Sequence, residues 1–160
     1  MMLNKEKAYI AGFLDGDGCI LFQLIRKSDY RLGFQVKASV IFYQNKKYRW
    51  FLLWLKEKLK YGYIRDRNDD ICEYNIVGFK AVEEVLGALY PYLRIKHDQA
   101  KLALGIIKKY PHNGRDYSPE MLMKIAKDID GFSFLNYSKK RTITSRTVKN
   151  HLVKSKLLSP

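Results

Sequence analysis

The chain has 160 residues, the length of one compact domain, and its 30 lysines and arginines against 16 aspartates and glutamates give a formal net charge of +14. A folded domain this basic usually has a polyanionic partner, although a soluble basic protein without a nucleic-acid role is the alternative interpretation. The sequence has no apolar run of about 18 residues, which argues against a membrane span. Its two cysteines, Cys19 and Cys72, are too few for a disulfide framework or a cysteine zinc site.

Hydrophobic alternation and turn signals predict a helix followed by a hairpin at the start of the chain. Residues 6–16 are typical of a helix, and residues 19–25 are rich in strand-forming side chains. Residues 27–29 form a turn signal, after which apolar and polar side chains alternate over residues 33–43. One face of the second strand should therefore lie on the core, while the other should be mostly polar.

The next segment repeats the order of helix and hairpin. A helix over residues 46–61, with Gly62 as its C-terminal cap, precedes two strands over residues 63–67 and 71–77. Cap, proline and apolar signals predict further helices over residues 79–89 and 96–110, from Ser118 onward, and from residue 144 or 145 to about residue 156.

This order predicts an α+β fold with one domain over residues 1–160 and an αββαββα core followed by extra C-terminal helices. Its strands would form a four-stranded antiparallel sheet with helices on one face and an open, polar face on the other. That open face would carry Lys37, Arg65 and Arg67. A two-stranded ribbon of this kind fits the major groove of DNA.

Small residues recur at four-residue spacing along the first predicted helix. Ala8, Gly12 and Gly16 would form one stripe on its surface. A glycine inside a helix costs up to about 1 kcal/mol, so two of them in one stripe need a reason. Small residues at this spacing allow another backbone to approach closely, and the natural partner is the same helix of a second subunit.

Two carboxylates, Asp15 and Asp17, fall at the end of the same helix. The C-terminal end of a helix carries partial negative charge, which disfavours a carboxylate there, and a bound divalent cation would reverse that local sign. Carboxylate oxygens suit Mg²⁺. The alternative interpretation is a polar turn between helix and strand, where aspartate and glycine are common.

The segment AGFLDGDG closely resembles the LAGLIDADG motif of homing endonucleases. The stretches FYQNKKYRWFL, YGYIRDR, YPYLRIKHDQA and LNYSKKRTITSRTV are also similar to the small, single-motif enzymes encoded in chloroplast introns. Because these stretches follow in order, the resemblance covers nearly the whole chain.

The resemblance implies a homodimer with the motif helices packed at a two-fold interface. It implies hydrolysis of phosphodiester bonds across the minor groove of a long, pseudo-palindromic site in double-stranded DNA. Asp17 would bind a divalent metal, with the carbonyl of Gly16 also facing it; Mg²⁺ is expected, and Mn²⁺ should substitute. Gln44 corresponds to a glutamine that orders water near the metal, and Lys96 to a lysine of the basic pocket.

The sequence departs from the family at Tyr48, where members usually carry arginine or lysine. A cation there would stabilise phosphate charge better than a tyrosine hydroxyl does. Lys47 and Arg49 flank the position, and either could supply the cation.

Strand alternation and the resemblance predict the residues that contact DNA. Those expected to face the groove are Gln23, Ile25, Tyr30, Gln35, Lys37, Ser39, Arg65, Arg67, Glu73 and Asn75. A basic run late in the chain consists of Lys139, Lys140 and Arg141. We expect it to contact backbone phosphates, and the alternative interpretation is a run of solvated charges.

Two rival functions remain open on the sequence alone. Some proteins of this family act as RNA-binding maturases for their host intron, and a DNA-binding module without catalysis would tolerate Tyr48. The set Asp17, Gln44 and Lys96 favours the nuclease, because a pure binding protein has no need of it. An organelle, chloroplast or mitochondrion, is the expected compartment if the gene is organellar, and the cytoplasm otherwise.

Overall fold

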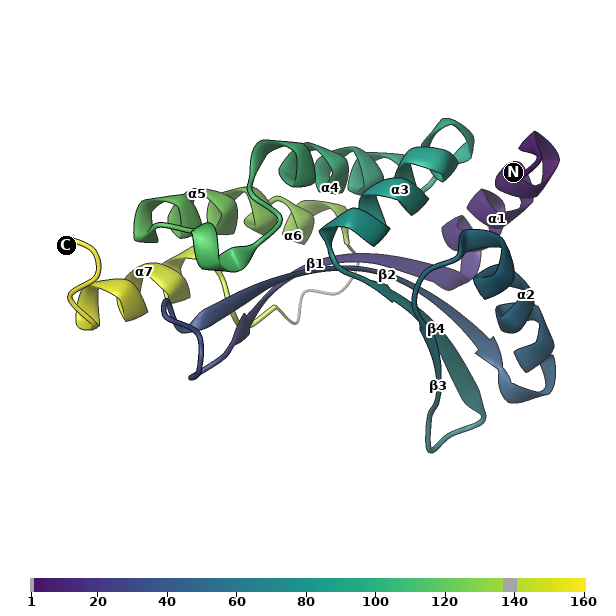
Figure 1. The fold of residues 1–160 in the computed structure, drawn as a ribbon, viewed down its shortest axis with the longest axis horizontal. Helices are drawn as coiled ribbons and strands as arrows, with labels where there is room; N and C mark the ends of the chain where they lie inside the picture. Colours follow the sequence, from purple (N-terminus) through teal and green to yellow (C-terminus); the bar gives the residue numbers. More distant parts are fainter. Residues whose placement is uncertain (1, 137–140) are drawn as a thin grey trace. The chain divides into compact units, whose positions relative to one another are not determined.

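The computed structural model describes residues 2–136 and 141–160 (Figure 1). Its helices and strands follow in the order α1 (Asn4–Asp17), β1 (Gly18–Arg26), β2 (Phe34–Asn45), η1 (Lys46–Tyr48), α2 (Arg49–Leu59), β3 (Tyr63–Asp66), β4 (Ile71–Val77), α3 (Phe79–Leu89), η2 (Tyr90–Tyr92), α4 (His97–Lys109), η3 (Gly114–Asp116), α5 (Pro119–Asp130), α6 (Phe132–Leu135) and α7 (Ser145–Lys154). The predicted α+β fold is confirmed. No helix among the described residues is long and apolar enough to cross a membrane.

The strands form one four-stranded sheet in the order β1-β2-β4-β3. Strand β2 pairs antiparallel with β4 from Ser39 opposite Val77 to Asn45 opposite Ile71. Strand β3 pairs antiparallel with β4 and sets Arg65 opposite Glu73. The predicted sheet is therefore confirmed, and its pairing places Arg65 of β3 beside the polar side chains of β4.

The chain divides into two compact units, the first Met1–Leu21 with Ala38–Leu104, and the second Phe22–Lys37 with Gly105–Pro160. In the first unit, helices α1, α2 and α3 each bury part of their apolar side chains, and Phe13 of α1 contacts both α2 and β2. Its ring lies 4.8 Å from that of Phe51 and 6.0 Å from that of Phe42. Phe42 in turn stacks on Tyr74 at 5.8 Å. These rings fix α1 and α2 against β2 and β4.

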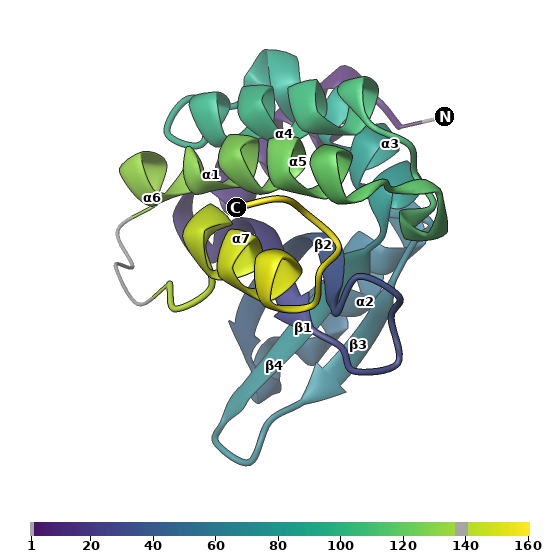
Figure 2. The same ribbon diagram turned by 90° about the vertical axis from the view of Figure 1, so that its left-hand side faces the viewer.

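The second unit has a core of its own, in which α5 and α7 lie side by side (Figure 2). Phe22 stacks on Phe132 at 5.9 Å, and Val148 and Leu152 of α7 are fully buried. The main-chain N–H of Ser145 donates to both carboxylate oxygens of Asp130 at 3.2 Å. This contact gives the first turn of α7 hydrogen-bond acceptors that the helix itself cannot supply.

The segment before the second hairpin differs from the prediction. The predicted helix over residues 46–61 is a 3₁₀ turn followed by the shorter α2, because the side chain of Asn45 accepts a hydrogen bond from the N–H of Lys47 and starts the turn. Gly62 is not the cap of this helix. Lys60 takes the left-handed cap conformation with φ of 66°, and its N–H donates to Lys56.

Gly62 has a different structural role. Its φ is +80°, and a Cβ atom built on it would overlap the main-chain oxygen of Asn75 in β4. The start of β3 can therefore approach β4 only because residue 62 has no side chain.

We expect Gly62→Ala to lower the free energy of unfolding by about 2 kcal/mol or more, since it combines a left-handed backbone with a steric overlap. Gly87→Ala is the matched control. Gly87 lies in α3 with open space where a Cβ would stand, so its replacement should leave stability equal or raise it by up to about 1 kcal/mol. Urea titrations of both variants measure the difference, and equal midpoints would contradict the proposed role of Gly62.

Candidate functional site

The end of α1 leads directly into β1 without a loop. The N–H of Gly18 donates to the main-chain oxygen of Leu14, and a Cβ on Gly18 would overlap Leu14. The glycine thus allows a helix to become a strand within one residue. The turn leaves Gly16 and Asp17 exposed at the helix end.

Asp17 is an exposed carboxylate, and the structure gives it no hydrogen bond or ion pair among the described residues. It lies where the helix dipole disfavours negative charge and where the last carbonyl oxygens lack intrahelical donors. These hard oxygen atoms fit a divalent cation. Among the described residues, no three histidine, cysteine, aspartate or glutamate side chains group to hold a metal by themselves. A metal here would therefore need water, phosphate or a second chain as further ligands.

Asp15, two residues earlier, lies in the opposite environment. It is only 9% exposed, and its carboxylate accepts hydrogen bonds from the N–H groups of Arg94 at 2.8 Å and Lys96 at 2.9 Å. Local sequence patterns do not predict the burial of Asp15, because its two hydrogen-bond donors lie far along the chain.

Lys96 is brought to the end of α1. Its Nζ donates to the main-chain oxygen of Asp15. Burial raises the pKa of the Cys19 thiol, and the nearby positive charge of Lys96 opposes that rise. The structure thus places Lys96 beside the helix end that carries Asp17, although β1, β2, α2, β3, β4 and α3 separate them in sequence.

Gln44 lies near the end of β2, and Tyr48 ends the short η1 helix that precedes α2. The side-chain carbonyl of Gln44 accepts a hydrogen bond from the N–H of Asn45 at 2.8 Å. Tyr48 is 44% exposed, and the Lys47 ammonium lies 4.9 Å from its ring centre. Arg49 instead pairs with Asp66 at 3.2 Å. No hydrogen bond among the described residues joins Gln44 or Tyr48 to Asp17 or Lys96, so their predicted roles stay predictions.

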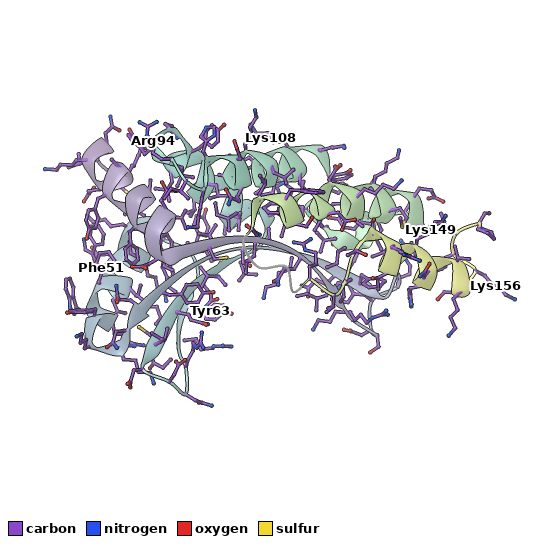
Figure 3. All side chains as sticks on the ribbon, turned by 180° about the vertical axis from the view of Figure 1, so that it is seen from behind. Phe51, Tyr63, Arg94, Lys108, Lys149 and Lys156 are labelled. Atoms are coloured by element: carbon purple, nitrogen blue, oxygen red, sulfur yellow. The ribbon has the colours of Figure 1, made fainter. Side chains whose placement is uncertain are left out.

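Arg65 of β3 and Arg67, which follows the strand, form an ion-pair cluster with Glu73 of β4. Glu73 contacts Arg65 at 3.4 Å and Arg67 at 3.5 Å, and Arg67 also contacts Asp69 at 2.9 Å. The side chain of Arg65 is 65% exposed, whereas that of Glu73 is 11% exposed. The arginines can therefore reach a ligand, while the glutamate lies behind them; Tyr63 on the same strand is also exposed (Figure 3).

Three residues of the predicted DNA-facing set are buried in this structure. Ser39 is 1% exposed, and its hydroxyl has no hydrogen-bond partner among the described residues. Glu73 and Asn75 are each 8% exposed. These residues lie on β2 and β4, the two inner strands, where side chains have neighbouring strands on both sides. Their contacts with DNA stay predictions.

The predicted DNA-contacting residues of the second unit differ in their exposure. Gln23 and Tyr30 are exposed, and a further group is partly exposed: Ile25, Gln35 and Lys37. Lys139 and Lys140 lie outside the described residues. The guanidinium of Arg141 donates to the main-chain oxygens of Ile129 at 2.9 Å and Phe22 at 3.0 Å. Arg141 therefore links segments of this unit, and its expected phosphate contact stays a prediction.

The small-residue stripe of α1 faces outward. Ala8, Gly12 and Gly16 are all exposed, and a Cβ on either glycine would meet nothing within 4 Å. Nothing among residues 2–136 and 141–160 therefore requires glycine at these two positions.

Comparison with known proteins gives consistent matches. Residues 10–97 match the family model described as LAGLIDADG endonuclease. The chain is 41% identical over 147 residues to DNA endonuclease I-CvuI of Chlorella vulgaris, covering 92% of this chain and 89% of that protein. It is 35% identical over 147 residues to DNA endonuclease I-CreI of Chlamydomonas reinhardtii, covering 91% of this chain and 88% of that protein. The crystal structure of the homing endonuclease I-CvuI in complex with the I-CreI target matches with a TM-score of 0.88 and 40% identity, over 96% of this chain and 94% of that chain.

Proposed function

We propose that this chain, which belongs to the LAGLIDADG endonuclease family, is a homing endonuclease that cuts both strands of DNA at a long, pseudo-palindromic site. The observation that carries the proposal is Asp17, exposed at the end of the motif helix and without a partner in the described part of the chain, with Lys96 held at the same helix end by the main-chain oxygen of Asp15. A protein that only binds nucleic acid gains nothing from a free carboxylate in a surface that must meet phosphates. We further propose that residues 1–160 form one domain and that the protein works in an organelle if its gene is organellar, and in the cytoplasm otherwise.

The proposed reaction is metal-dependent hydrolysis of phosphodiester bonds. Asp17 and the carbonyl of Gly16 would hold Mg²⁺, or Mn²⁺ in its place, and the bound ion would supply Lewis acidity and an activated water. The I-CvuI complexes with DNA were obtained in the presence of Mg²⁺ or Ca²⁺, which supports a divalent ion. The Lys96 ammonium would stabilise negative charge on the phosphate, and Gln44 would order the attacking water.

The proposed assembly is a homodimer. The exposed stripe of Ala8, Gly12 and Gly16 supports it, because two stripes of this kind let helices approach closely without a clash. Each subunit would contribute one Asp17, which suits a reaction on both DNA strands. A two-fold dimer would read two half-sites of about one helical turn each.

The proposed DNA surface includes Arg65 and Arg67. Their ion pairs with Glu73 are long and partly solvated, so the arginines can exchange this carboxylate for guanine edges at modest cost. Gln23 and Tyr30, which are exposed in the second unit, are further proposed contacts.

Cleavage of DNA selected from a randomised pool tests the function. We expect the unmodified protein to cut selected sites in Mg²⁺ and to bind them without cutting in Ca²⁺. Asp17→Asn should bind the same DNA with an affinity within about threefold of that of the unmodified protein. It should cut at least about 100-fold more slowly, because it removes the proposed metal ligand. Cutting by Asp17→Asn near the original rate would contradict the role of Asp17. Selection of RNA in preference to DNA would favour the maturase, and DNA binding without cutting would favour the non-catalytic module.

Sedimentation tests the homodimer. We expect a dimer for the unmodified protein and a folded monomer for Gly12→Leu, because the leucine meets open space within its own chain and a steric clash only at the proposed interface. Gly87→Leu, on another exposed helix position, is the control and should remain dimeric. A monomeric unmodified protein at micromolar concentration would exclude the assembly.

Single-turnover rates test which cation compensates for Tyr48. Lys47→Ala should slow cleavage about tenfold without a comparable loss of affinity, because the Lys47 ammonium lies over Tyr48 and pairs with no carboxylate of the described residues. Arg49→Ala should have a smaller effect, because its guanidinium is engaged by Asp66. Unchanged rates for both variants would leave Lys96 as the sole cation near the reaction.

A further inference from the structure

The carboxylate of Asp15 is buried, yet no side-chain cation among the described residues pairs with it. Its two oxygens instead accept main-chain N–H groups, Oδ2 from Arg94 at 2.8 Å and Oδ1 from Lys96 at 2.9 Å. The side chain of Arg94 extends from the surface (Figure 3), so only its backbone takes part. A buried carboxylate that bonds two backbone donors is a specific structural link, because removing either partner leaves a buried polar group unpaired.

This link joins the end of one helix to the start of another. The main-chain oxygen of Lys96 accepts the N–H of Ala100 at 3.0 Å, so Lys96 opens the first turn of α4. The Asp15 carboxylate therefore lies at the positive end of α4, which offsets its unfavourable place near the negative end of α1. The position of α4 relative to the motif helix depends on Asp15.

The same residue also holds the side chain of Lys96. The Lys96 ammonium donates to the main-chain oxygen of Asp15 in the last turn of α1, two residues before Asp17. Asp15 thus fixes the backbone of Lys96 through its carboxylate and the ammonium of Lys96 through its carbonyl.

We propose that Asp15 is the positioning residue of the site: it holds the Lys96 ammonium at the end of the motif helix and acts on the reaction only through Lys96. This inference rests on the proposed function. Asp15 does not act as a second metal carboxylate, because both its oxygens are taken by N–H donors and the residue is 9% exposed. The paired aspartates of the motif therefore have separate tasks.

Asp15→Asn tests the link, because asparagine keeps the shape but offers one acceptor oxygen in place of two. We expect a lower melting temperature, amide NMR signals of Arg94 and Lys96 that shift and exchange faster, and single-turnover cleavage slowed about tenfold. Affinity for the same DNA in Ca²⁺ should change by less than about twofold. Asp17→Asn is the matched control, and it should leave both amide signals in place while abolishing cleavage.

A double-mutant cycle tests whether Asp15 acts through Lys96. In a Lys96→Ala background, Asp15→Asn should slow cleavage no further, because the ammonium to be positioned is already gone. Rates that multiply would show an independent effect of Asp15 and overturn the proposal.

A second pair of variants leaves Asp15 in place, in case Asp15→Asn does not fold. Arg94→Pro removes the N–H donor together with the side chain, whereas Arg94→Ala removes the side chain alone. Slower cleavage by the proline variant than by the alanine variant supports the link, and equal rates overturn it.

Failure of the proposed function and failure of the link give different results. If the unmodified protein cuts no selected DNA, the proposed function fails. Unchanged amide signals in Asp15→Asn would instead overturn the link itself.

Discussion

The carboxylate of Asp15 bonds two backbone donors that lie at the start of α4, and the geometry of the candidate site depends on this contact. A charge near the negative end of one helix becomes acceptable because it meets the positive end of another. Once this contact forms, the end of the motif helix cannot rotate without breaking two partly buried hydrogen bonds. Asp17 is then held outward on a rigid helix end, with the Lys96 ammonium beside it.

The site combines such buried, satisfied groups with exposed groups that lack partners. Each carboxylate oxygen of Asp15 accepts a main-chain N–H, whereas Asp17 has no hydrogen bond from the described residues. Arg141 has a guanidinium bonded to main-chain oxygens, whereas Arg65 stays mostly exposed on β3. Buried polar groups with full hydrogen bonding give rigidity, and exposed groups with weak internal pairing remain available for a ligand. This division separates the residues that build the surface from those proposed to act on DNA.

The exposed stripe on α1 contains two glycines, Gly12 and Gly16, that lie inside a helix. Glycine destabilises a helix by up to about 1 kcal/mol, and neither Gly12 nor Gly16 is needed for packing within the chain. Gly62 is different, because the approach of β3 to β4 requires it. A glycine that the fold requires and a glycine that the fold merely tolerates look the same in sequence. The tolerated pair is explained by the proposed second subunit.

The sequence by itself determined the α+β fold, the order of helix and hairpin, and the polar face of the sheet, because periodic burial and turn chemistry act over short distances along the chain. It also identified the motif helix with Asp17 at its end. Only the tertiary structure decided that Asp15 is buried, that Lys96 lies beside it, that Arg141 is an internal tie and that Ser39 is covered. Each of these features depends on residues that folding brings together from distant segments of the chain. Local sequence patterns do not predict which donor will bond which acceptor.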